Sequence, residues 1–520
     1  MKIHKGKKAV VLRLKNTSRV LTVIPTAKQV DEHTVAIPHR PDETRVLRNL
    51  GFDVPDPMPI HYEWPKVQGK FDPFDAQVDT ASFLSMSSRA FCLNDMGTGK
   101  TSSALWAFDY LKKQKAVKRM LVVCPLSTME RTWADSVFHT FPHLEATVLY
   151  GTRDRRRKLL GEESDIYIIN IDGLSTIKDL LAARDDIDLI VVDELALARN
   201  ASTERWKTLN LICNKQTKRR VWGMTGSPTP NAPTDAWAQC RLVTPNSTNV
   251  PMYFGKFRDT VMRQLTQFKW VARPEANDII YDMMQPAIRY SLDDCTDLPE
   301  QTFITRDVEM TPEQKKAYKD MLNKLSTEYA GGQILAVNEA VKANKLIQIA
   351  CGVAYGLNHE EVFIPSKPRL DALRELIDES AGKVIVFVPL TGALEALAKD
   401  LSKDYTVEVV HGETSKHERD RIFSSFQKTQ YPRVLVANAQ TMSHGLTLTA
   451  ATTIVWYAPI HSNEIYEQAC ARVRRPGQTR TTVIAHIAGS EVERRVYKRL
   501  ESKQSMQGIL LEMMKERPES

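Results

Sequence analysis

The sequence predicts an α/β protein built from two lobes, each a parallel β-sheet covered by helices on both faces. Short, uninterrupted apolar runs alternate with longer stretches of helical periodicity, which is typical of strands buried on both faces. The pattern occurs twice without repeating its residues, so we expect two separate sheets. The runs of the first set are 120–124, 166–170, 189–193 and 221–225, and those of the second are 384–388, 407–410, 434–437, 453–457 and 483–485.

Elements outside the two sheets complete the predicted organisation. The stretch 232–366 is interrupted by proline and has helical character, and its clearest helix begins at a capping box, Thr311–Gln314. A second capping box, Ser415–Glu418, opens a helix of the second lobe. The first sixty residues contain two β-rich runs, Ala9–Leu14 and Val20–Ile24. We expect a small β-rich accessory domain at 1–65, the first lobe at 66–245, a helical interlobe region at 246–365, and the second lobe with a C-terminal helix at 366–520.

Composition sets broad limits on compartment and ligands. The 520 residues include 71 Lys and Arg against 63 Asp and Glu, a mild basic excess that is compatible with a polyanionic ligand but does not require one. The seven cysteines are scattered and never form a Cys-x-x-Cys pair, which favours a reducing compartment and no zinc site. No apolar run is long enough to span a bilayer or to form the core of a signal peptide. We therefore expect a cytoplasmic protein without membrane contact.

A phosphate-binding loop is the clearest functional motif. The sequence Gly-Thr-Gly-Lys-Thr at Gly97–Thr101 lies between an apolar segment, 90–93, and a helical pattern. Glycines let backbone N–H groups approach phosphates, and the N-terminus of the following helix favours an anion. Lys100 would reach the β- and γ-phosphates of a nucleotide, and the Thr101 hydroxyl would face Mg²⁺. The motif departs from the common pattern at Asn94, where a glycine is usual.

An acidic pair ends a predicted strand of the first lobe. Asp193 and Glu194 follow the apolar run 189–192, which places them at the carboxyl edge of the sheet, where open α/β folds bind ligands. There Asp193 would hold Mg²⁺, and Glu194 would orient or deprotonate the attacking water. The sequence therefore predicts ATP and Mg²⁺ as ligands and ATP hydrolysis as the reaction.

Further motifs make the chain resemble the Swi/Snf-like ATPases of helicase superfamily 2, including the small versions that phages carry. The resemblance covers about 74–514. Its motifs are Pro73–Gln77, Met96–Thr101, Val123–Ser127, Met224–Asn231, Leu298–Glu300 with Val308–Gln314, His411–Gly412, Gly445–Leu448 and, most diagnostic, Gln468–Gln478. The resemblance implies two RecA-like lobes, with ATP bound at the loop of the first lobe and its site completed by the second, and a DNA track across both.

The resemblance also implies residue roles. Catalytic roles fall to Lys100, Asp193, Glu194, Gln468, Arg472 and Arg475, with the two arginines as arginine fingers. Nucleotide-binding roles fall to Gln77, as the adenine-recognising glutamine, and to Met96, Gly97, Thr98, Gly99, Lys100, Thr101 and Gly445. Mg²⁺ would be held by Thr101 and Asp193, and Thr225, Gly226 and Ser227 would couple hydrolysis to lobe movement.

The spacing of the second-lobe motif has its own physical interpretation. On one continuous helix, Gln468, Arg472 and Arg475 fall at i, i+4 and i+7 and therefore project from one face. Guanidinium groups spread their charge over several donors and suit the oxygens of a transferring phosphoryl group. One face of this helix could therefore meet one phosphate chain.

The residues after the acidic pair depart from the family pattern. Family members usually place a small residue and then a polar one there, whereas this chain has Leu195-Ala196. The catalytic carboxylates are kept. The departure puts in question the polar link that, in the family, normally joins the nucleotide site to the coupling motif near Thr225.

Together these features predict an ATP-dependent DNA translocase or helicase, in which DNA-stimulated hydrolysis drives movement along duplex or branched DNA without sequence preference. Three basic clusters, 112–115, 153–158 and 215–220, could contact phosphates, although such runs are usually solvated surface. A strand-separating helicase and a DNA-binding scaffold with a weakened ATPase are the alternatives. We expect a monomer in the bacterial or phage-infected cytoplasm, open to recruitment by proteins of replication, repair or recombination.

Overall fold

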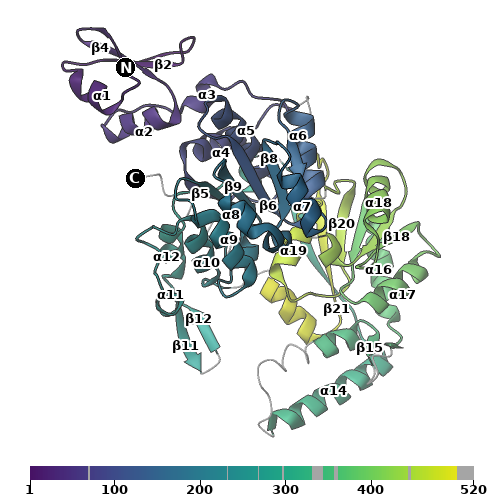
Figure 1. Cartoon of the computed structure of the whole chain (residues 1–520). Helices are drawn as coiled ribbons and strands as arrows, with labels where there is room; N and C mark the ends of the chain where they lie inside the picture. The colour runs from purple at the N-terminus through teal and green to yellow at the C-terminus, as the bar shows by residue number, and fades with distance from the viewer. Residues whose placement is uncertain are drawn as a thin grey trace. The chain divides into compact units, whose positions relative to one another are not determined.

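The chain, described here as a computed structural model, divides into two units. The first comprises Met1–Arg263 and Val271–Cys295, and the second comprises Gln264–Trp270 and Thr296–Ile509. Each unit contains one large parallel sheet, and the first also carries a small N-terminal sheet (Figure 1). The structure describes residues 1–67, 71–230, 232–266, 269–295, 298–330, 344–355, 361–442 and 447–500.

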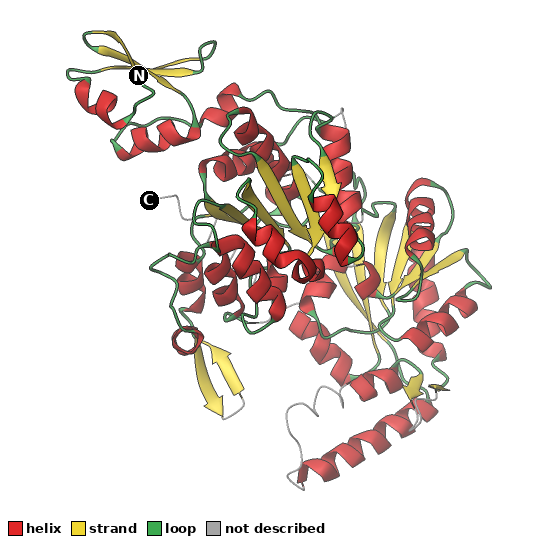
Figure 2. Ribbon diagram, in the orientation of Figure 1, coloured by secondary structure: helices red, strands yellow, loops and turns green. Residues whose placement is uncertain are grey.

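The N-terminal domain is a four-stranded antiparallel sheet with two helices on one side of it (Figure 2). The strand order is β1-β2-β4-β3. The domain has its own hydrophobic core, to which both helices contribute. The two central strands supply alternate residues to this core: Val10, Leu12, Val35 and Ile37. The elements are β1 (Lys2–His4), β2 (Ala9–Arg13), α1 (Ser18–Val23), β3 (Lys28–Asp31), β4 (Thr34–Pro38) and α2 (Pro41–Asn49). The predicted small β-rich domain is thus confirmed.

One of the two predicted strands of this domain is wrong, because Val20–Ile24 begins within α1 and is not extended. Val20 and Ile24 are four residues apart, and both are buried in the domain core. The Asn16 side chain supports the start of the helix by accepting a hydrogen bond from the Ser18 N–H at 2.9 Å. Burial on one helix face therefore outweighs the β-propensity of the sequence. The strands that the prediction lacked are β1, β3 and β4.

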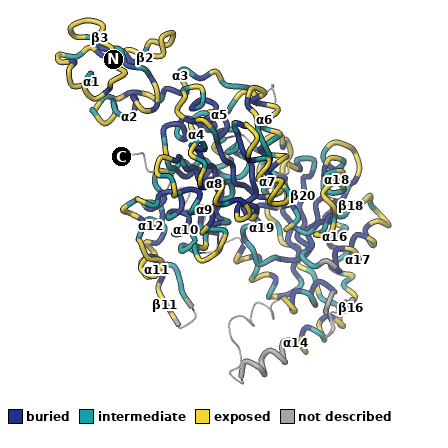
Figure 3. The backbone as a smooth tube through the Cα atoms, viewed as in Figure 1, coloured by how far each residue is buried: buried dark blue, intermediate teal, exposed yellow. Residues whose placement is uncertain are grey.

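The first lobe is a seven-stranded sheet in which all paired strands are parallel. Its order is β13-β5-β10-β9-β6-β8-β7. The strands are β5 (Arg89–Cys92), β6 (Arg119–Cys124), β7 (Ala146–Val148), β8 (Ile166–Asn170), β9 (Ile187–Asp193), β10 (Arg220–Met224) and β13 (Ala287–Ile288). All four predicted runs of this lobe are strands, and their central residues are buried (Figure 3). Of the other three strands, β5 overlaps the apolar segment 90–93 that precedes the phosphate loop, and β7 and β13, which were not predicted, are short and lie at the edges.

Helices flank this sheet on both faces. Large side chains such as Trp106, Trp133 and Phe108 fill the core on one face and are fully buried. The helices are α3 (Pro57–His61), α4 (Asp75–Met86), α5 (Lys100–Lys113), α6 (Asp135–Thr140), α7 (Arg153–Leu160), α8 (Lys178–Ala183), α9 (Glu204–Asn214), α10 (Asp235–Val243), α11 (Phe254–Val261), α12 (Ala276–Met283) and α13 (Leu292–Cys295). Short helical turns are η1 (Leu126–Thr128), η2 (Met129–Ala134), η3 (Ile171–Ile177) and η4 (Leu195–Ala198), and a hairpin is formed by β11 (Met262–Thr266) and β12 (Lys269–Ala272).

The second lobe is a six-stranded parallel sheet with the order β14-β21-β20-β17-β19-β18. All five predicted runs of this lobe are strands, so the prediction of two RecA-like lobes is confirmed. The strands are β14 (Gln301–Asp307), β17 (Lys383–Phe387), β18 (Val407–Val410), β19 (Val434–Ala437), β20 (Ala451–Trp456) and β21 (Thr482–Ala488). The other elements are α14 (Pro312–Ala330), β15 (Val353–Tyr355), β16 (Glu361–Phe363), α16 (Lys367–Glu379), α17 (Thr391–Leu401), α18 (Lys416–Lys428), η5 (Ala439–Met442) and α19 (Asn463–Cys470).

The stretch between the two predicted lobes contributes to both units. Residues 271–295 belong to the first unit, whereas β14 pairs with β21 in the second sheet. The capping box of α14 forms as predicted: the Thr311 N–H donates to Gln314 Oε1 at 3.0 Å, and the Gln314 N–H donates to Thr311 Oγ1 at 3.3 Å. Among the helices of the described residues, none combines the length and the apolar character that crossing a bilayer requires.

Candidate nucleotide site

The predicted phosphate loop joins the end of β5 to the start of α5. Gly97 and Gly99 have φ angles of 88° and 85°, in the left-handed region that favours glycine. A Cβ atom at Gly99 would lie 2.1 Å from Gln77 Nε2, so a side chain there would also displace the Gln77 amide from the loop. The loop can therefore curve tightly, and its backbone N–H groups would lie close to an anion bound at the N-terminus of α5.

Two predicted nucleotide-binding side chains contact this loop directly. Lys100 Nζ donates to the carbonyl oxygens of Asn94 at 2.9 Å and Asp95 at 3.0 Å, which holds its positive charge inside the curve of the loop. Gln77 Nε2 donates to the Thr98 carbonyl at 3.1 Å. The structure thus brings the start of α4 to the loop, and adenine recognition by Gln77 stays a prediction.

Asn94, the position where the motif lacks its usual glycine, is a buried anchor of the loop. Its side chain donates from Nδ2 to Thr80 Oγ1 at 2.8 Å and accepts from the Tyr290 N–H at 2.9 Å. The next residue, Asp95, pairs with Arg289 at 2.6 Å between Oδ1 and Nη2. The segment after β13 therefore braces the loop, a role that no local sequence signal reveals because about 195 residues separate the partners.

Replacing Asn94 with the usual glycine is expected to destabilise the protein. Asn94→Gly would leave the Tyr290 N–H without its acceptor, which costs about 1–3 kcal/mol for a polar group held away from water. It would also remove the donor to Thr80 Oγ1, whose own bond to the Ala76 carbonyl remains. Thermal or urea unfolding of the full chain checks this, with Asn246→Gly, at an exposed asparagine, as the matched control. Equal stability of both variants would contradict the brace.

The acidic pair lies at the end of β9, beside the loop. Asp193 Oδ2 accepts a hydrogen bond from Trp133 Nε1 at 3.0 Å, and Asp193 Oδ1 accepts the Glu194 N–H at 3.1 Å. Burial, together with the Glu194 charge, raises the pKa of Asp193 to about 6, while the Trp133 hydrogen bond and the Lys100 charge oppose this. A nearby cation would stabilise the charged form of this buried carboxyl group, and carboxylate oxygens are among the ligands that Mg²⁺ prefers.

The predicted coupling motif contacts the phosphate loop. The Thr225 N–H donates to the Cys92 carbonyl at 3.1 Å, and the Ser227 N–H donates to Thr225 Oγ1 at 3.2 Å. A Cβ atom at Gly226 would lie 3.5 Å from the Asn94 carbonyl oxygen and from Met96. The first unit therefore assembles the loop, the acidic pair and the coupling motif at the carboxyl edge of one sheet.

Leu195 stands where the family pattern has a small residue, and Ala196 stands where it has a polar one. Leu195 and Ala196 are both buried. A Cβ atom at Gly223 of β10 would lie 2.6 Å from Leu195 Cδ2 and 2.8 Å from Val243 Cγ2. The segment after the acidic pair thus packs closely on the strand that leads to Thr225. Ala196, at the position of the polar residue, is buried and has no side-chain hydrogen-bonding group that could form the polar link.

The second unit holds the predicted arginine motif, but its helix is shorter than the spacing suggested. The helix α19 ends at Cys470, so the expectation that Gln468, Arg472 and Arg475 share one helix face is wrong. The Arg472 carbonyl accepts from the Leu448 N–H at 3.0 Å, and the residue four positions on, Pro476, has no N–H to continue the helix.

The three residues of this motif differ in exposure. Gln468 and Arg472 are buried, with exposed fractions of 2% and 3%. Arg475 stays partly exposed; its Nη1 donates to Thr447 Oγ1 at 3.2 Å, and its Nε donates to the Ala471 carbonyl at 3.1 Å. Gly445 and Asn231, which the resemblance also singled out, lie outside the described residues.

The three basic clusters noted in the sequence contain structural side chains. Lys112 pairs with Asp165 and Lys113 pairs with Asp109, both at 2.7 Å. Arg219 is buried and donates to backbone carbonyls of neighbouring segments, including Ile187 at 3.2 Å. Arg156 of the remaining cluster is buried as well, so each cluster offers fewer free charges than its sequence suggests.

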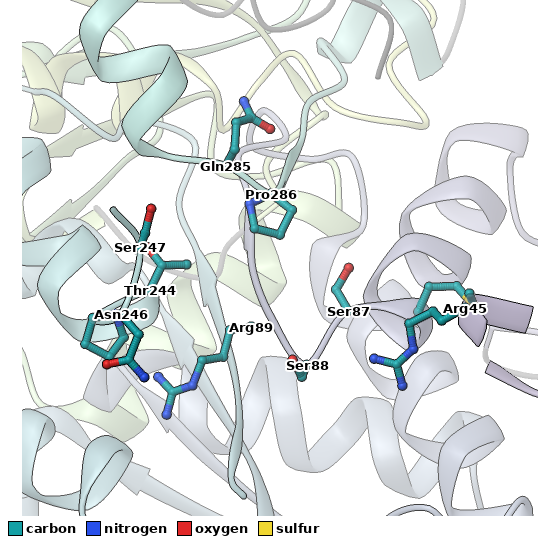
Figure 4. A pocket seen from close by; sticks show the side chains of 11 residues that line it. Arg45, Ser87, Ser88, Arg89, Thr244, Asn246, Ser247, Gln285 and Pro286 are labelled. Atoms are coloured by element: carbon teal, nitrogen blue, oxygen red, sulfur yellow. The ribbon is translucent and has the colours of Figure 1, made fainter. Parts of the chain in front are cut away.

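An open cavity of about 500 Å³ lies elsewhere in the first unit (Figure 4). It is lined by Arg45, Met86, Ser87, Ser88, Arg89, Thr244, Pro245, Asn246, Ser247, Gln285 and Pro286. Arg89 begins β5, whereas the phosphate loop follows the end of β5, so the cavity and the loop lie at opposite edges of the sheet. The Arg89 guanidinium is engaged by Asn214 Oδ1 at 2.9 Å and the Cys213 carbonyl at 3.0 Å. The cavity is therefore separate from the nucleotide site.

Comparison with known families agrees with this architecture. The SNF2-related domain profile matches residues 84–352, and the helicase conserved C-terminal domain profile matches residues 368–477. Together with the two parallel sheets, these matches define a helicase-type ATPase, an enzyme that hydrolyses ATP. The chain belongs to the SNF2-related family.

Individual relatives are distant and differ in length. Protein p41 of Acyrthosiphon pisum secondary endosymbiont phage 1 is 26% identical, over 81% of this chain and 94% of p41. The chromodomain-helicase-DNA-binding protein 1-like of Mus musculus is 23% identical over 81% of this chain, but the match spans only 47% of that protein. The solved Sulfolobus solfataricus SWI2/SNF2 ATPase core in complex with dsDNA is 22% identical, with 88% of this chain and 97% of that chain covered and a TM-score of 0.41.

Proposed function

We propose that this ATPase is a motor that moves along duplex or branched DNA without sequence preference. The observation that carries the proposal is the direct packing of Gly226, in the coupling motif, against the phosphate loop. A segment that touches the loop can shift when the nucleotide changes, which is what a motor requires. The name of the mouse relative, which includes DNA binding, supports DNA as the track. A monomeric state and a cytoplasmic location are part of the proposal.

The chain's own residues supply most of the proposed chemistry. The loop N–H groups and Lys100 would bind the phosphates, and Glu194 would orient the attacking water or accept its proton. Thr101 and Asp193 offer the oxygen ligands that Mg²⁺ prefers; when bound, the ion would neutralise charge on the phosphates. Arg475 would stabilise charge on the transferring phosphoryl group.

Stimulation of ATP hydrolysis by nucleic acids tests the proposal. Phosphate release is measured with duplex, single-stranded, forked and four-way DNA and with RNA, each at saturating concentration. Duplex or branched DNA is expected to stimulate hydrolysis most, independent of base sequence. Equal rates with and without every DNA would overturn the proposal. Displacement of a third strand from a triplex, without unwinding of a forked duplex, distinguishes a translocase from a strand-separating helicase.

Lys100→Ala supplies the baseline for these measurements. Removal of the ammonium group from the loop is expected to lower turnover by about 10²–10³-fold, the usual effect of losing one preorganised donor to a reacting group. Lys207→Ala is the matched control because it lies in α9 of the same unit, in an exposed surface pair with Glu204. The control is expected to keep turnover within about twofold of the unmodified enzyme. Turnover near the unmodified rate in Lys100→Ala would exclude this loop as the phosphate site.

A further inference from the structure

The outer face of the N-terminal sheet is open and basic. The strand alternation that buries Val10 and Leu12 directs Val11 and Arg13 of β2 to the opposite face. The register Lys2↔Val11 adds Lys2 to that face, and Lys28↔Ala36 adds Lys28. Both domain helices lie on the inner side (Figure 2), and the three basic residues of the outer face, Lys2, Arg13 and Lys28, are exposed. We call this surface the open face.

The charge around the open face is strongly unbalanced. Residues 1–40 contain nine Lys and Arg but only two Asp and Glu, in contrast with the nearly even balance of the whole chain. All nine basic residues are exposed, and none forms an ion pair within the described part of the chain. Of the two acidic residues, Glu32 lies in the turn between β3 and β4, whereas Asp31 ends β3 opposite Thr34, on the same face as Arg13, with which it interacts electrostatically. The basic clusters of the first lobe, by contrast, are partly buried or paired, so the open face has the freer charges.

The composition of the open face indicates which polyanion it fits. An excess of Lys and Arg side chains on a sheet suits the regularly spaced phosphates of a nucleic-acid backbone. Recognition of unpaired bases uses aromatic stacking platforms, but the first 51 residues contain no Phe, Tyr or Trp. Contact with the backbone of a duplex is therefore favoured over contact with unstacked single-stranded bases.

We propose that the open face is a second nucleic-acid contact, which binds the phosphate backbone of duplex DNA independently of ATP. The proposal rests on the proposed function, since it concerns how the motor is attached to its DNA. It adds a site outside both lobes, in a domain with its own hydrophobic core. Such a contact would raise the affinity for duplex without changing the chemistry at the phosphate loop.

The test uses the full chain with a triple charge reversal, Lys2→Glu, Arg13→Glu and Lys28→Glu. The matched control reverses three exposed lysines of the second unit, Lys319→Glu, Lys399→Glu and Lys428→Glu, which changes the net charge equally. Binding of a labelled 30-base-pair duplex without nucleotide is measured over a range of salt concentrations. The open-face variant is expected to bind at least about tenfold more weakly at low salt, with a salt slope smaller by about 2–3, since each lost phosphate contact removes about 0.9. Hydrolysis without DNA is expected to be unchanged in both variants.

The outcomes separate this proposal from the proposed function. Equal affinity and salt slope in the two variants would overturn the second contact, even where DNA still stimulates hydrolysis by the unmodified enzyme. If no DNA stimulates hydrolysis by the unmodified enzyme, the proposed function is overturned instead. Binding of both variants to phosphatidylserine vesicles and to a polyglutamate peptide is measured in parallel. If the open-face variant binds either of these more weakly but keeps its affinity for duplex, the occupant is not DNA and the proposal fails.

Discussion

Arg475→Ala is expected to lower the turnover of ATP by about 10³–10⁵-fold, the range found for arginine fingers in phosphoryl transfer. Of the two predicted finger residues, Arg475 is the partly exposed one, whereas Arg472 is buried. The Thr447 hydroxyl and the Ala471 carbonyl hold its guanidinium group in one orientation. A side chain that is both accessible and oriented can meet an incoming phosphate. Steady-state phosphate release at saturating ATP and DNA gives the rate.

The neighbouring arginine supplies the control for this experiment. Arg474→Ala removes the same charge from the same loop, where the Arg474 side chain donates to the Pro299 carbonyl at 3.4 Å. It is expected to cost no more than about tenfold, because a general change in local charge is screened by solvent. Similar losses in both variants would show that the motif acts through charge or folding alone. The finger assignment would then be withdrawn.

Glu194→Gln is expected to lower turnover by about 10²–10⁴-fold while ATP binding persists. The amide keeps the size of the side chain, and the Glu194 N–H bond to Asp193 is made by the backbone, so the local fold is preserved. The change removes the carboxylate that would accept a proton from water. Titration with a fluorescent ATP analogue measures binding, and single-turnover hydrolysis measures the chemical step.

Glu204→Gln, in the first turn of α9, is the matched control for the loss of one carboxylate. Its rate is expected to match that of the unmodified enzyme, because Glu204 is exposed and its Lys207 pair is a surface pair. If Glu194→Gln hydrolyses ATP at more than about one-tenth of the unmodified rate, another group accepts the proton. Weakened nucleotide binding in Glu194→Gln would instead assign this residue to binding and not to the chemical step.

Local patterns in the sequence predicted much of the fold and of the first-lobe site. The buried strands are continuous apolar runs, and the Gly97–Thr101 loop and the Thr311 capping box are each formed by residues close in sequence. Long-range partners were not predictable. The bonds from Tyr290 to Asn94 and from Arg289 to Asp95 depend on pairing of β13 beside β5, and β13 is two residues long.

Two errors came from local signals that were weighted wrongly. The β-branched residues at Val20–Ile24 favoured a strand, but burial of one face of α1 decided the conformation. The expected helix through Arg475 ignored Pro476, whose missing N–H was visible in the sequence. Pro476 denies only the Arg472 carbonyl a helical partner and does not account for the end of α19 at Cys470, whereas i, i+4 spacing is compatible with a helix but does not require one.

The contact between Leu195 and Gly223 also constrains which substitutions these two positions can accept during evolution. A side chain at 223 would overlap Leu195 and the stiff, buried Val243, so leucine at 195 is tolerated only beside glycine. A lineage that acquired this leucine must have had glycine at 223 beforehand or gained it at the same step. Once both are present, replacement of the glycine requires both Leu195 and Val243 to give way. The residues tolerated at these positions are therefore coupled by geometry.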